Sequence, residues 1–496
     1  MESAITTISP TTCALLLIAL FAAARSILSS NKGKPWIRVG RSPGFLGLNR
    51  KKAAAEFRAN GRQIIRDGYR RHKGNNFVVQ TANKEQLVID PKYLPEIRML
   101  PETKISHAKV IIDNLVGEHI GAEMAMEGAQ HIDAVRGPVT KNLNKLVPMM
   151  AREYRRTSEF LFSQIGRDGN QVNVYQFCYA TVSSITSAVL IGEDLTHIGG
   201  WNEIVMEYFP EAWRIRNALW HWPRLLRPLV KPFLVRTNQL DAIIAKAETF
   251  LKEPVRKRRE PSNHDVDVLK FLAEYGESER KIAMQIVGII TGALNTSTHA
   301  LTQALYDLAA HPQYIDDIRT EALNALSSEG GQWTFNVTKR LHLLDAFLKE
   351  SLRLFAPEGL AVTRVATSPI TLSDGTHIPR GTYLSVAGEA MALDNDFYPH
   401  ASEFNPRRFL GDDGKPVTPE SVFHGIEAGN GVWGAGRLTC PGRHFASAMA
   451  KIIVASLVIK FDIAFPGTQK EGPRGVEDDC NYVPDLGAMV VLKERG

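Results

Sequence analysis

The sequence predicts a mainly α-helical protein with small β-sheets, built as one large domain behind an N-terminal transmembrane helix. Three observations carry this prediction. Apolar residues recur at helical spacing through long stretches, such as 141–165 and 172–191. Short β-rich segments near 76–89 and 361–388 are separated by turn residues. No linker rich in Gly, Ser and Pro divides residues 60–496.

The composition excludes several classes of protein. The chain has 496 residues, with 59 Lys and Arg against 53 Asp and Glu, a formal net charge of +6. Hydrophobic residues make up 44% and charged residues 23%, which is ordinary for a globular protein and unlike collagen, a wholly disordered chain or a polytopic membrane protein. The 4 cysteines are scattered and include no Cys-x-x-Cys pair, so a disulfide scaffold is also excluded.

The N-terminus predicts a membrane anchor. Residues 3–24 carry no charge, and about 20 apolar residues suffice for a helix to cross a bilayer. Basic residues begin at Arg25, and positive charge after a span places that end on the cytoplasmic side. A cleaved secretory signal is the alternative, but it needs Lys or Arg before the apolar run, where only Glu2 stands. We therefore predict an uncleaved anchor over 1–30, a basic juxtamembrane linker over 31–60 and a cytosolic domain over 61–496.

The positive charge of the chain is concentrated beside this anchor. Residues 25–75 hold 14 Lys and Arg and 2 Asp and Glu, a net charge of +12, so the rest of the chain carries a net charge of −6. A basic segment next to a span is attracted to anionic lipid of the cytosolic leaflet. The charge therefore predicts contact with membrane lipid, and it gives no support for a nucleic-acid partner.

A long buried helix is expected from about Ser278 to His311. Its stretch 282–294 is apolar on most faces, so the helix should lie inside the protein. Its middle holds the polar run Asn295-Thr296-Ser297-Thr298, and a buried helix must satisfy or use such groups. Two interpretations follow from the residues alone. Either the hydroxyls bond back to the carbonyl four residues earlier, or the run is functional.

A second helix is expected from about Leu341 to Phe355. Glu350 and Arg353 are one turn apart and share a face of this helix. The flanking residues are mostly Leu and Phe, which predicts that the pair is partly buried. A buried pair of charges needs further hydrogen bonds.

A glycine-rich loop presents a single cysteine. The loop over 429–442 is dense in glycine up to Cys440, and a helical pattern with apolar residues four apart begins at Phe445. A cysteine just before a helix N-terminus is stabilised as the thiolate, which serves as a nucleophile or a metal ligand. No second cysteine or histidine cluster offers a zinc site. A lone axial thiolate to haem iron fits, and a buried structural cysteine is the alternative.

Four motifs in one order make a family resemblance plain. Trp433-Gly434-x-Gly436-x-x-x-Cys440-x-Gly442 resembles the haem-binding signature of the cytochrome P450 superfamily, the haem-thiolate monooxygenases. Glu350-x-x-Arg353 resembles its K-helix motif, 404–409 with Arg408 resembles its meander, and 292–296 sits where its I-helix motif would be. The match spans nearly all of the chain. It is most similar to fungal enzymes of secondary metabolism, including the kaurene-oxidase-like group.

The resemblance implies a cytochrome P450 fold, a haem b (heme b) cofactor and a role for each matching residue. Cys440 would be the axial metal ligand, and Arg136 and Arg364 would bind the haem propionates. Thr296 would organise water for proton delivery on the distal side, with Asn295 assisting by orientation. Glu350, Arg353 and Arg408 would form a structural triad. The remaining cofactor-binding positions lie on the cysteine loop: Trp433, Gly434, Gly436, Arg437 and Gly442.

The chain departs from the pattern of the family at several positions. Trp433 stands where Phe is usual; it still gives an aromatic wall and adds an N–H that could reach the sulfur. Leu438 stands where an Arg or His usually meets a propionate. Asn295 replaces the usual acid before the I-helix threonine, and an amide cannot donate a proton by ionising. The usual C-helix Trp-x-x-x-Arg keeps only Arg136, with Ile132 at the Trp position.

The expected function is a monooxygenase that uses O2 and NADPH electrons to hydroxylate or epoxidise a lipophilic, terpenoid-like natural product in fungal secondary metabolism. Two alternatives stay open: oxidative phenol coupling or rearrangement at the same haem without net oxygen insertion, and a non-catalytic membrane-anchored haem protein. The expected partners are NADPH-cytochrome P450 reductase, membrane lipid and a small lipophilic substrate, with no nucleic acid and no obligate oligomer.

The expected location is the endoplasmic reticulum membrane, with a single span and a cytosolic catalytic domain. Substrate choice in the family depends on three segments, here near 105–125, 200–235 and 357–364, and these are apolar enough to suggest a hydrophobic ligand. Tryptophan favours the membrane interface, so Trp220-His221-Trp222-Pro223 is expected to touch the membrane.

Overall fold

The structure is a computed structural model that describes residues 36–44, 49–163, 170–235, 239–260, 267–469 and 471–495. The predicted membrane anchor over 1–30 lies outside the described residues. The folded part begins earlier than residue 61. The first strand, β1 (Ile37–Val39), joins a sheet, and α2 (Arg50–Arg71) contains residue 61, so this part of the predicted linker is ordered structure.

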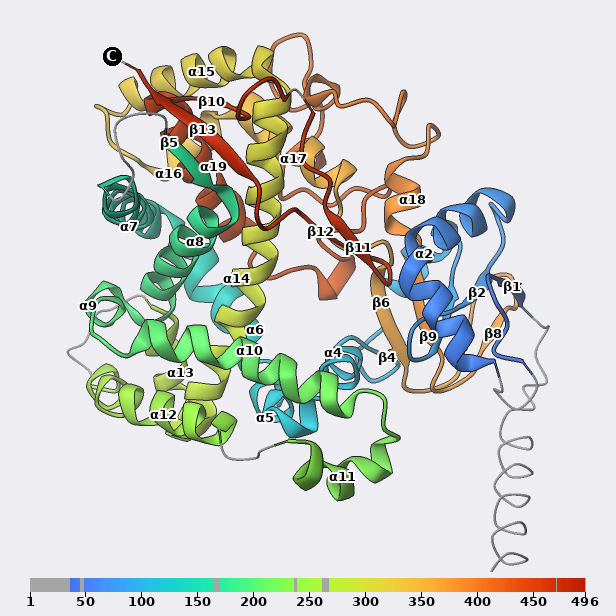
Figure 1. Ribbon diagram of the computed structural model, residues 1–496. Helices are drawn as coiled ribbons and strands as arrows, with labels where there is room; N and C mark the ends of the chain where they lie inside the picture. The colour runs from blue at the N-terminus through green and yellow to red at the C-terminus, as the bar shows by residue number, and fades with distance from the viewer. Residues whose placement is uncertain are drawn as a thin grey trace, which may run out of the picture.

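The helical part of the molecule is built around α14 (Glu279–Ala310), the long diagonal helix at the centre of Figure 1. This helix packs against α8 (Val174–Ile191), α12 (Gln239–Arg258) and α17 (His342–Leu354). It is apolar on most faces because helices surround it on most sides. The Ser278 side chain caps its start by accepting a hydrogen bond from the Lys281 N–H. The prediction of a buried helix over 278–311 is confirmed.

Helices flank α14 on several sides, and short ones join them. The longer ones are α7 (Leu143–Ser163), α10 (Trp201–Leu219), α15 (Ile315–Ser327) and α19 (Arg443–Lys460). The shorter ones are α3 (Leu94–Ile97), α4 (Ala108–Leu115), α5 (Ala122–Met126), α6 (Gln130–Ala134), α9 (Glu193–Thr196), α11 (Arg227–Leu234), α13 (Val268–Glu274), α16 (Phe335–Arg340) and α18 (Gly388–Ala392). The helical spacing over 141–165 and 172–191 is thereby confirmed as α7 and α8.

A β-rich part lies beside the helical part, at the right of Figure 1. Its sheet has the strand order β1-β2-β3-β9-β6-β4 and its own hydrophobic core, which packs under α2. The strands are β2 (Phe77–Gln80), β3 (Glu85–Val88), β4 (Ile105–Ser106), β6 (Ala361–Ala366) and β9 (Tyr383–Val386). The β-rich segments near 76–89 and 361–388 are confirmed by this sheet.

Smaller sheets complete the fold. One has the order β10-β13-β5, with β5 (Asn170–Asn173), β10 (Phe461–Ala464) and β13 (Met489–Glu494). The hairpin of β11 (Val476–Asp478) and β12 (Asn481–Val483) reaches the end of α17, because the Tyr482 N–H donates to the Pro357 carbonyl. A further pair joins β7 (Ile370–Thr371) and β8 (His377–Ile378).

Among the described residues, one helix is long and apolar enough to cross a membrane, and it is α8. This helix packs between α7 and α14, and most of its residues are buried inside the protein. Its apolar character is therefore explained by its place in the core, as for the central helix of many soluble domains.

Candidate functional site

Cys440 lies where the sequence places it, on a loop directly before α19. The Cys440 N–H donates to the Trp433 carbonyl at 2.8 Å, which closes the loop on itself. Gly434 and Gly436 adopt φ of 77° and 61°, values that glycine takes without strain. A Cβ on Gly436 would lie 2.2 Å from the Arg98 carbonyl oxygen, so this loop tolerates no side chain there. Glycine therefore sets the shape that presents the cysteine.

Burial raises the pKa of the Cys440 thiol. The N–H groups of Gly442 and Arg443 and the charges of Arg443 and Arg136 act in the opposite direction, but desolvation outweighs them. The sequence prediction that the helix N-terminus stabilises the thiolate is therefore only partly right: the stabilising groups are present and burial exceeds their effect. A bound metal ion would supply the missing positive charge, since a coordinating thiol is deprotonated outright.

Two arginines from distant segments meet at the cysteine loop. Arg136, on the one-turn π-helix η4 (Val135–Val139), donates from Nη2 to the Arg437 carbonyl at 2.6 Å. Arg364, on β6, donates from Nη2 to the Leu438 carbonyl at 3.5 Å. No carboxylate in the described part of the chain lies within ion-pair distance of either guanidinium. Burial lowers the pKa of Arg364 to about 10, and the negative charge of Glu102 offsets this effect only in part.

The position of Arg364 depends on a bulge in β6. The register between β6 and β9 shifts between Ala361 and Arg364, and Val362 has φ of 54°, which is rare for a β-branched residue. A Cβ on Gly388 or on Gly431 would lie 2.6 Å from the Ala361 Cβ. The bulge is thus held between two glycines, one of which belongs to the cysteine loop.

His107 is a site residue that the sequence analysis missed. Its Nδ1 lies 3.1 Å from Arg364 Nη1 and 3.1 Å from the Thr363 carbonyl oxygen. Burial, together with the charge of Arg364, lowers the pKa of His107 to about 4, so the imidazole is neutral at physiological pH. The neutral His107 ring therefore contacts Arg364 without adding a second positive charge. No local pattern marks it, because its partner is 257 residues away.

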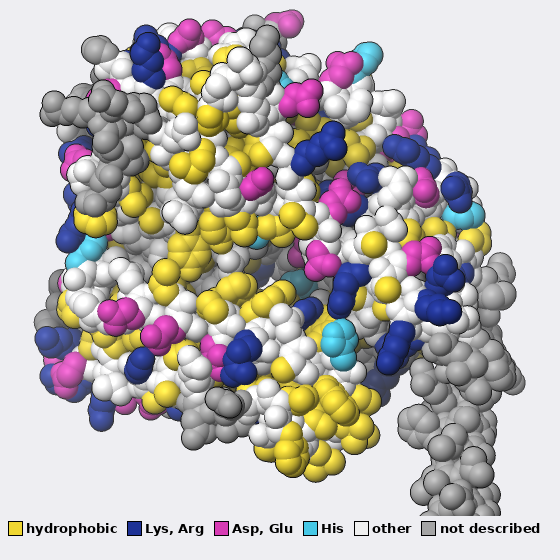
Figure 2. All heavy atoms as spheres, in the orientation of Figure 1, with side chains coloured by type: hydrophobic (Ala, Val, Ile, Leu, Met, Phe, Trp, Pro, Cys, Tyr) yellow, Lys and Arg dark blue, Asp and Glu magenta, His cyan; other side chains and the backbone are white. Residues whose placement is uncertain are grey.

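The polar run of α14 agrees in part with each of the two interpretations given above. The Thr296 hydroxyl donates to the Gly292 carbonyl at 2.8 Å, and Asn295 Nδ2 lies 3.4 Å from the Thr291 carbonyl oxygen. These are the bonds to the preceding turn that the simpler interpretation predicts. The Thr296 side chain is nevertheless exposed in the middle of a helix that runs through the core. Figure 2 shows the face hollowed near its middle, where the helical and β-rich parts meet.

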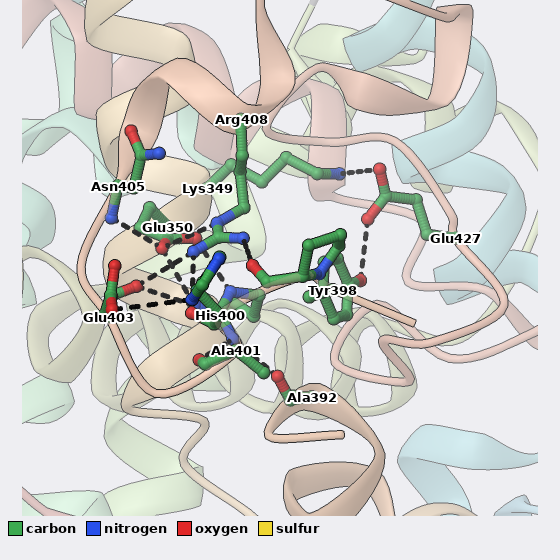
Figure 3. A network of polar contacts seen from close by, with 12 residues as sticks. Lys349, Glu350, Ala392, Tyr398, His400, Ala401, Glu403, Asn405, Arg408 and Glu427 are labelled. Carbon is green, nitrogen blue, oxygen red and sulfur yellow. Dashed lines mark hydrogen bonds and ion pairs between the residues drawn. The ribbon is translucent and has the colours of Figure 1, made fainter. Parts of the chain in front are cut away.

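Glu350 and Arg353 both belong to α17, and Arg408 meets them from the segment 404–409; Figure 3 shows Glu350 beside Arg408. Arg353 Nε lies 2.7 Å from one Glu350 oxygen, and Arg408 Nε lies 3.1 Å from the other. Both side chains of the helix pair are 0% exposed, which is deeper burial than the sequence predicted. The Asn405 N–H also donates to Glu350 at 2.8 Å, and Arg353 donates to the Ala401 carbonyl. The buried charges are thus fully hydrogen-bonded, as such a group requires.

Trp433 differs from its expected role. Its indole N–H donates to the Phe423 carbonyl at 2.7 Å, and the two rings meet edge to face with their planes 82° apart. The N–H that could have reached the Cys440 sulfur is therefore bound to a backbone carbonyl instead. This hydrogen bond joins the start of the cysteine loop to the segment that contains Phe423. The Arg437 side chain is exposed, and its part in the site is through its carbonyl, which accepts from Arg136.

The residues present fit a haem. An iron porphyrin requires an axial ligand, backbone that packs closely around that ligand, and cations near its two propionates. Cys440 supplies the ligand, the glycines supply the approach, and Arg136 and Arg364 supply cations that no described carboxylate neutralises. A buried arginine without an anion is costly, and a propionate removes that cost.

Comparisons with known proteins also indicate a haem-binding family. A model of the cytochrome P450 family matches residues 130–475. The cytochrome P450 monooxygenase AN1598 of Emericella nidulans is 28% identical over 447 residues, which cover 87% of this chain and 83% of that protein. The cytochrome P450 monooxygenase olcJ of Penicillium canescens is 26% identical, with 88% and 85% covered. Ent-kaurene oxidase P450-4 of Gibberella fujikuroi is 26% identical, with 88% of each chain covered.

Proposed function

This chain belongs to the cytochrome P450 family and is an oxidoreductase, and from that premise we propose the reaction it catalyses. It is a haem-thiolate monooxygenase that takes NADPH electrons through a membrane-bound reductase and inserts one oxygen atom of O2 into a lipophilic, terpenoid-like substrate. The fungal monooxygenases and the ent-kaurene oxidase among its relatives support this substrate class. The observation that carries the proposal is Cys440 on its glycine loop beside Arg136 and Arg364, neither of which forms an ion pair with a described carboxylate.

Each residue of the site has a task in this proposal. Haem b, when bound through the Cys440 thiolate, supplies the activation of dioxygen. Arg136 and Arg364 hold the two carboxylate arms of the cofactor and so fix its rotation in the pocket. The glycines of the loop allow the thiolate to approach while the N–H groups of Gly442 and Arg443 share its charge. These residues bind and orient the cofactor and move no proton.

Thr296 and Asn295 serve the proton supply. The Thr296 hydroxyl donates a hydrogen bond to the Gly292 carbonyl, so its oxygen is free to accept a hydrogen bond from a water molecule. A water held there lies on the exposed side of α14, where the reaction needs protons. Asn295 orients such a water through its amide and cannot ionise. In this proposal the amide slows proton delivery relative to a carboxylic acid and does not abolish it.

The membrane is the second partner that we propose. The one-turn helix η5 (Arg224–Leu226) and α11 expose Leu225, Leu229 and Phe233, with Leu225 90% and Phe233 88% exposed. Figure 2 shows hydrophobic side chains gathered over α11 at the lower edge of the view. Trp220 is only 9% exposed and lies under the Arg216 guanidinium, so its expected interface contact is wrong. We assign the lipid contact to the apolar face of η5 and α11, on a cytosolic domain at the endoplasmic reticulum.

The experiment begins with the cofactor. The full chain is purified, and the reduced protein is exposed to carbon monoxide. The wild type should give the difference spectrum of thiolate-ligated haem, and Cys440→Ser should lose it while Cys178→Ser keeps it. Cys178 is a suitable control because it is a buried free cysteine on α8. A wild type without this spectrum would contradict the proposal and favour a non-catalytic protein.

The reaction itself is tested with labelled oxygen. A panel of terpenoids is screened for spectral shifts, and the ligands found are incubated with NADPH, reductase and 18O2. Monooxygenation places one labelled atom in the product, whereas phenol coupling or rearrangement places none. Thr296→Ala should raise the NADPH consumed per product formed. Thr249→Ala is the matched control, because Thr249 makes the same bond to the preceding turn on an exposed face of α12.

A further inference from the structure

Two further buried charges lie on α17, one turn apart on the same face. Asp345 and Lys349 are each 3% exposed, and neither belongs to the triad of Glu350, Arg353 and Arg408. A buried charge is costly unless it is paired and hydrogen-bonded. The contacts of these two residues therefore show what they hold in place.

Both charges bind the backbone of one segment that precedes the cysteine loop. Lys349 Nζ donates to the Glu420 carbonyl at 2.8 Å and to the Val422 carbonyl at 3.0 Å. One carboxylate oxygen of Asp345 accepts from the Phe423 N–H at 2.5 Å. A cation that binds carbonyl groups and an anion that binds an N–H group together fix the course of this segment.

Each of the two charges also has a partner of opposite sign. The second carboxylate oxygen of Asp345 forms an ion pair with Lys451 of α19, the helix that begins after the cysteine loop. Lys349 Nζ lies 3.5 Å from a Glu427 oxygen (Figure 3). The Asp345 carboxylate is thus held by α17 and α19 together, so it offers the Phe423 N–H an acceptor in a fixed place.

Phe423 passes this constraint to the cysteine loop. Its carbonyl accepts from the Trp433 indole N–H at 2.7 Å, and its ring, which is buried, meets the indole edge to face. The Trp433 carbonyl accepts in turn from the Cys440 N–H at 2.8 Å. An unbroken series of contacts leads from the Asp345 carboxylate to the backbone of the cysteine.

We infer that Asp345 is a positioning residue for Cys440, because it fixes Phe423 and, through the Trp433 indole, the cysteine loop. The inference rests on the proposed function, in which the Cys440 thiolate binds the haem iron. A loop held at Trp433 keeps the sulfur where an iron–thiolate bond requires it. A loose loop lets the sulfur withdraw and take one proton from solvent, which converts the thiolate to a thiol.

Two double variants isolate the hydrogen bond to Phe423. Asp345→Asn with Lys451→Met keeps an oxygen that accepts from this N–H, whereas Asp345→Leu with Lys451→Met, the acceptor-free variant, offers none. Both lack the ion pair and leave no charge of that pair buried alone. The reduced full-length holoenzyme is exposed to carbon monoxide. The ratio of thiol-ligated to thiolate-ligated haem should be about tenfold higher in the acceptor-free variant.

Amide hydrogen exchange gives a second readout that does not depend on haem. The protected amides of the peptide over 429–442 should exchange about tenfold faster in the acceptor-free variant, because the Cys440 N–H is released more often. A wild type without the spectrum of thiolate-ligated haem contradicts the proposed function. The exchange rates of the two double variants still decide the present inference in that case.

Trp433→Phe tests the next contact without touching the ion pair. It keeps an aromatic ring and removes the indole N–H, so it should raise the thiol-ligated ratio in the wild type and add little in the acceptor-free variant. Trp201→Phe is the matched control, because the buried Trp201 indole donates to the Ser187 hydroxyl at 3.1 Å.

Three outcomes overturn the inference. The first is an equal ratio and equal exchange in the two double variants. The second is a Trp433→Phe protein that matches the wild type in both readouts, which decides the matter even where the acceptor-free variant does not fold. The third is a Trp201→Phe effect as large as that of Trp433→Phe, which would assign the change to general destabilisation.

Discussion

At the scale of single residues, burial and partners together decide the charge of a group. Cys440 and Asp307 both lie inside the protein, and burial raises the pKa of each. For Cys440 a bound metal ion would supply the compensation. For Asp307 it comes from the side chains of Ser351 and Gln303, and Gln303 Nε2 lies 2.9 Å from one carboxylate oxygen. The other oxygen of Asp307 has no hydrogen-bond partner in the described residues.

The stability of the protein should therefore depend on Asp307. Burial raises its pKa from the usual 3.8 to about 7. Between these values the folded protein holds a proton that the unfolded chain has released, so the free energy of unfolding falls as the pH rises to about 7. Asp307→Asn should remove this loss, amounting to about 3 kcal/mol between pH 5 and pH 7.

Denaturant unfolding of both proteins at pH 5, 6 and 7 measures this effect. The difference in unfolding free energy should shift in favour of Asp307→Asn with each step in pH. Asp412→Asn is the control, because Asp412 is exposed and its substitution should leave the pH dependence as in the wild type. Parallel pH profiles for the wild type and Asp307→Asn would show that Asp307 is ionised in the folded protein.

At the scale of elements, β6 and the cysteine loop form one unit. The bulge at Val362 aims Arg364 at the loop, and Gly431 of the loop packs on Ala361 of the strand. The strand therefore cannot shift without moving both the arginine and the loop. This coupling explains why the loop needs glycine at a position far from its cysteine.

Gly431→Ala should damage this unit. The added methyl group would lie 2.6 Å from the Ala361 Cβ, and overpacking of this kind costs about 1–3 kcal/mol. We expect a lower denaturation midpoint and faster loss of haem to an acceptor protein. Gly472→Ala is the matched control, because a Cβ there meets nothing within 4 Å. Equal rates of haem loss in the two variants would show that β6 can shift without affecting the cysteine loop.

At the scale of the whole molecule, the apolar face of η5 and α11 stands out from a mixed surface. Leu225, Leu229 and Phe233 lie four residues apart and are all exposed, whereas exposed apolar residues elsewhere are scattered. A membrane removes this face from water without a protein partner. It would also set the hollow of the catalytic domain at a fixed height above the bilayer.

Substitution on this face should weaken membrane binding. In a chain without residues 1–30, Leu229→Asp with Phe233→Asp should lower the fraction that sediments with anionic liposomes by about tenfold or more, because two large apolar side chains no longer enter the bilayer. Leu323→Asp is the control, since Leu323 is 48% exposed on α15. An equal loss of liposome binding in Leu323→Asp would show that the binding does not depend on the apolar face of η5 and α11.

The sequence predicted the parts of the molecule that depend on neighbours in the chain. The helical spacing of α14 and α17, the turn between Glu350 and Arg353 and the glycine loop at Cys440 are all local patterns. Patterns of this kind act through contacts three or four residues apart, so they can be read without a fold. The resemblance to the family rests on the same local motifs, and the family comparison confirms it.

Contacts between distant segments could not be predicted in this way. His107 meets Arg364 across 257 residues, and the Trp433 indole turns to the Phe423 carbonyl and away from the sulfur. The sequence by itself determined the family, the main helices and the cysteine that would bind iron. Only the tertiary structure decided which charges are buried, Arg353 and Arg364 among them, and which apolar face stays exposed. Desolvation and pairing depend on what packing brings together, and no short stretch of sequence contains that information.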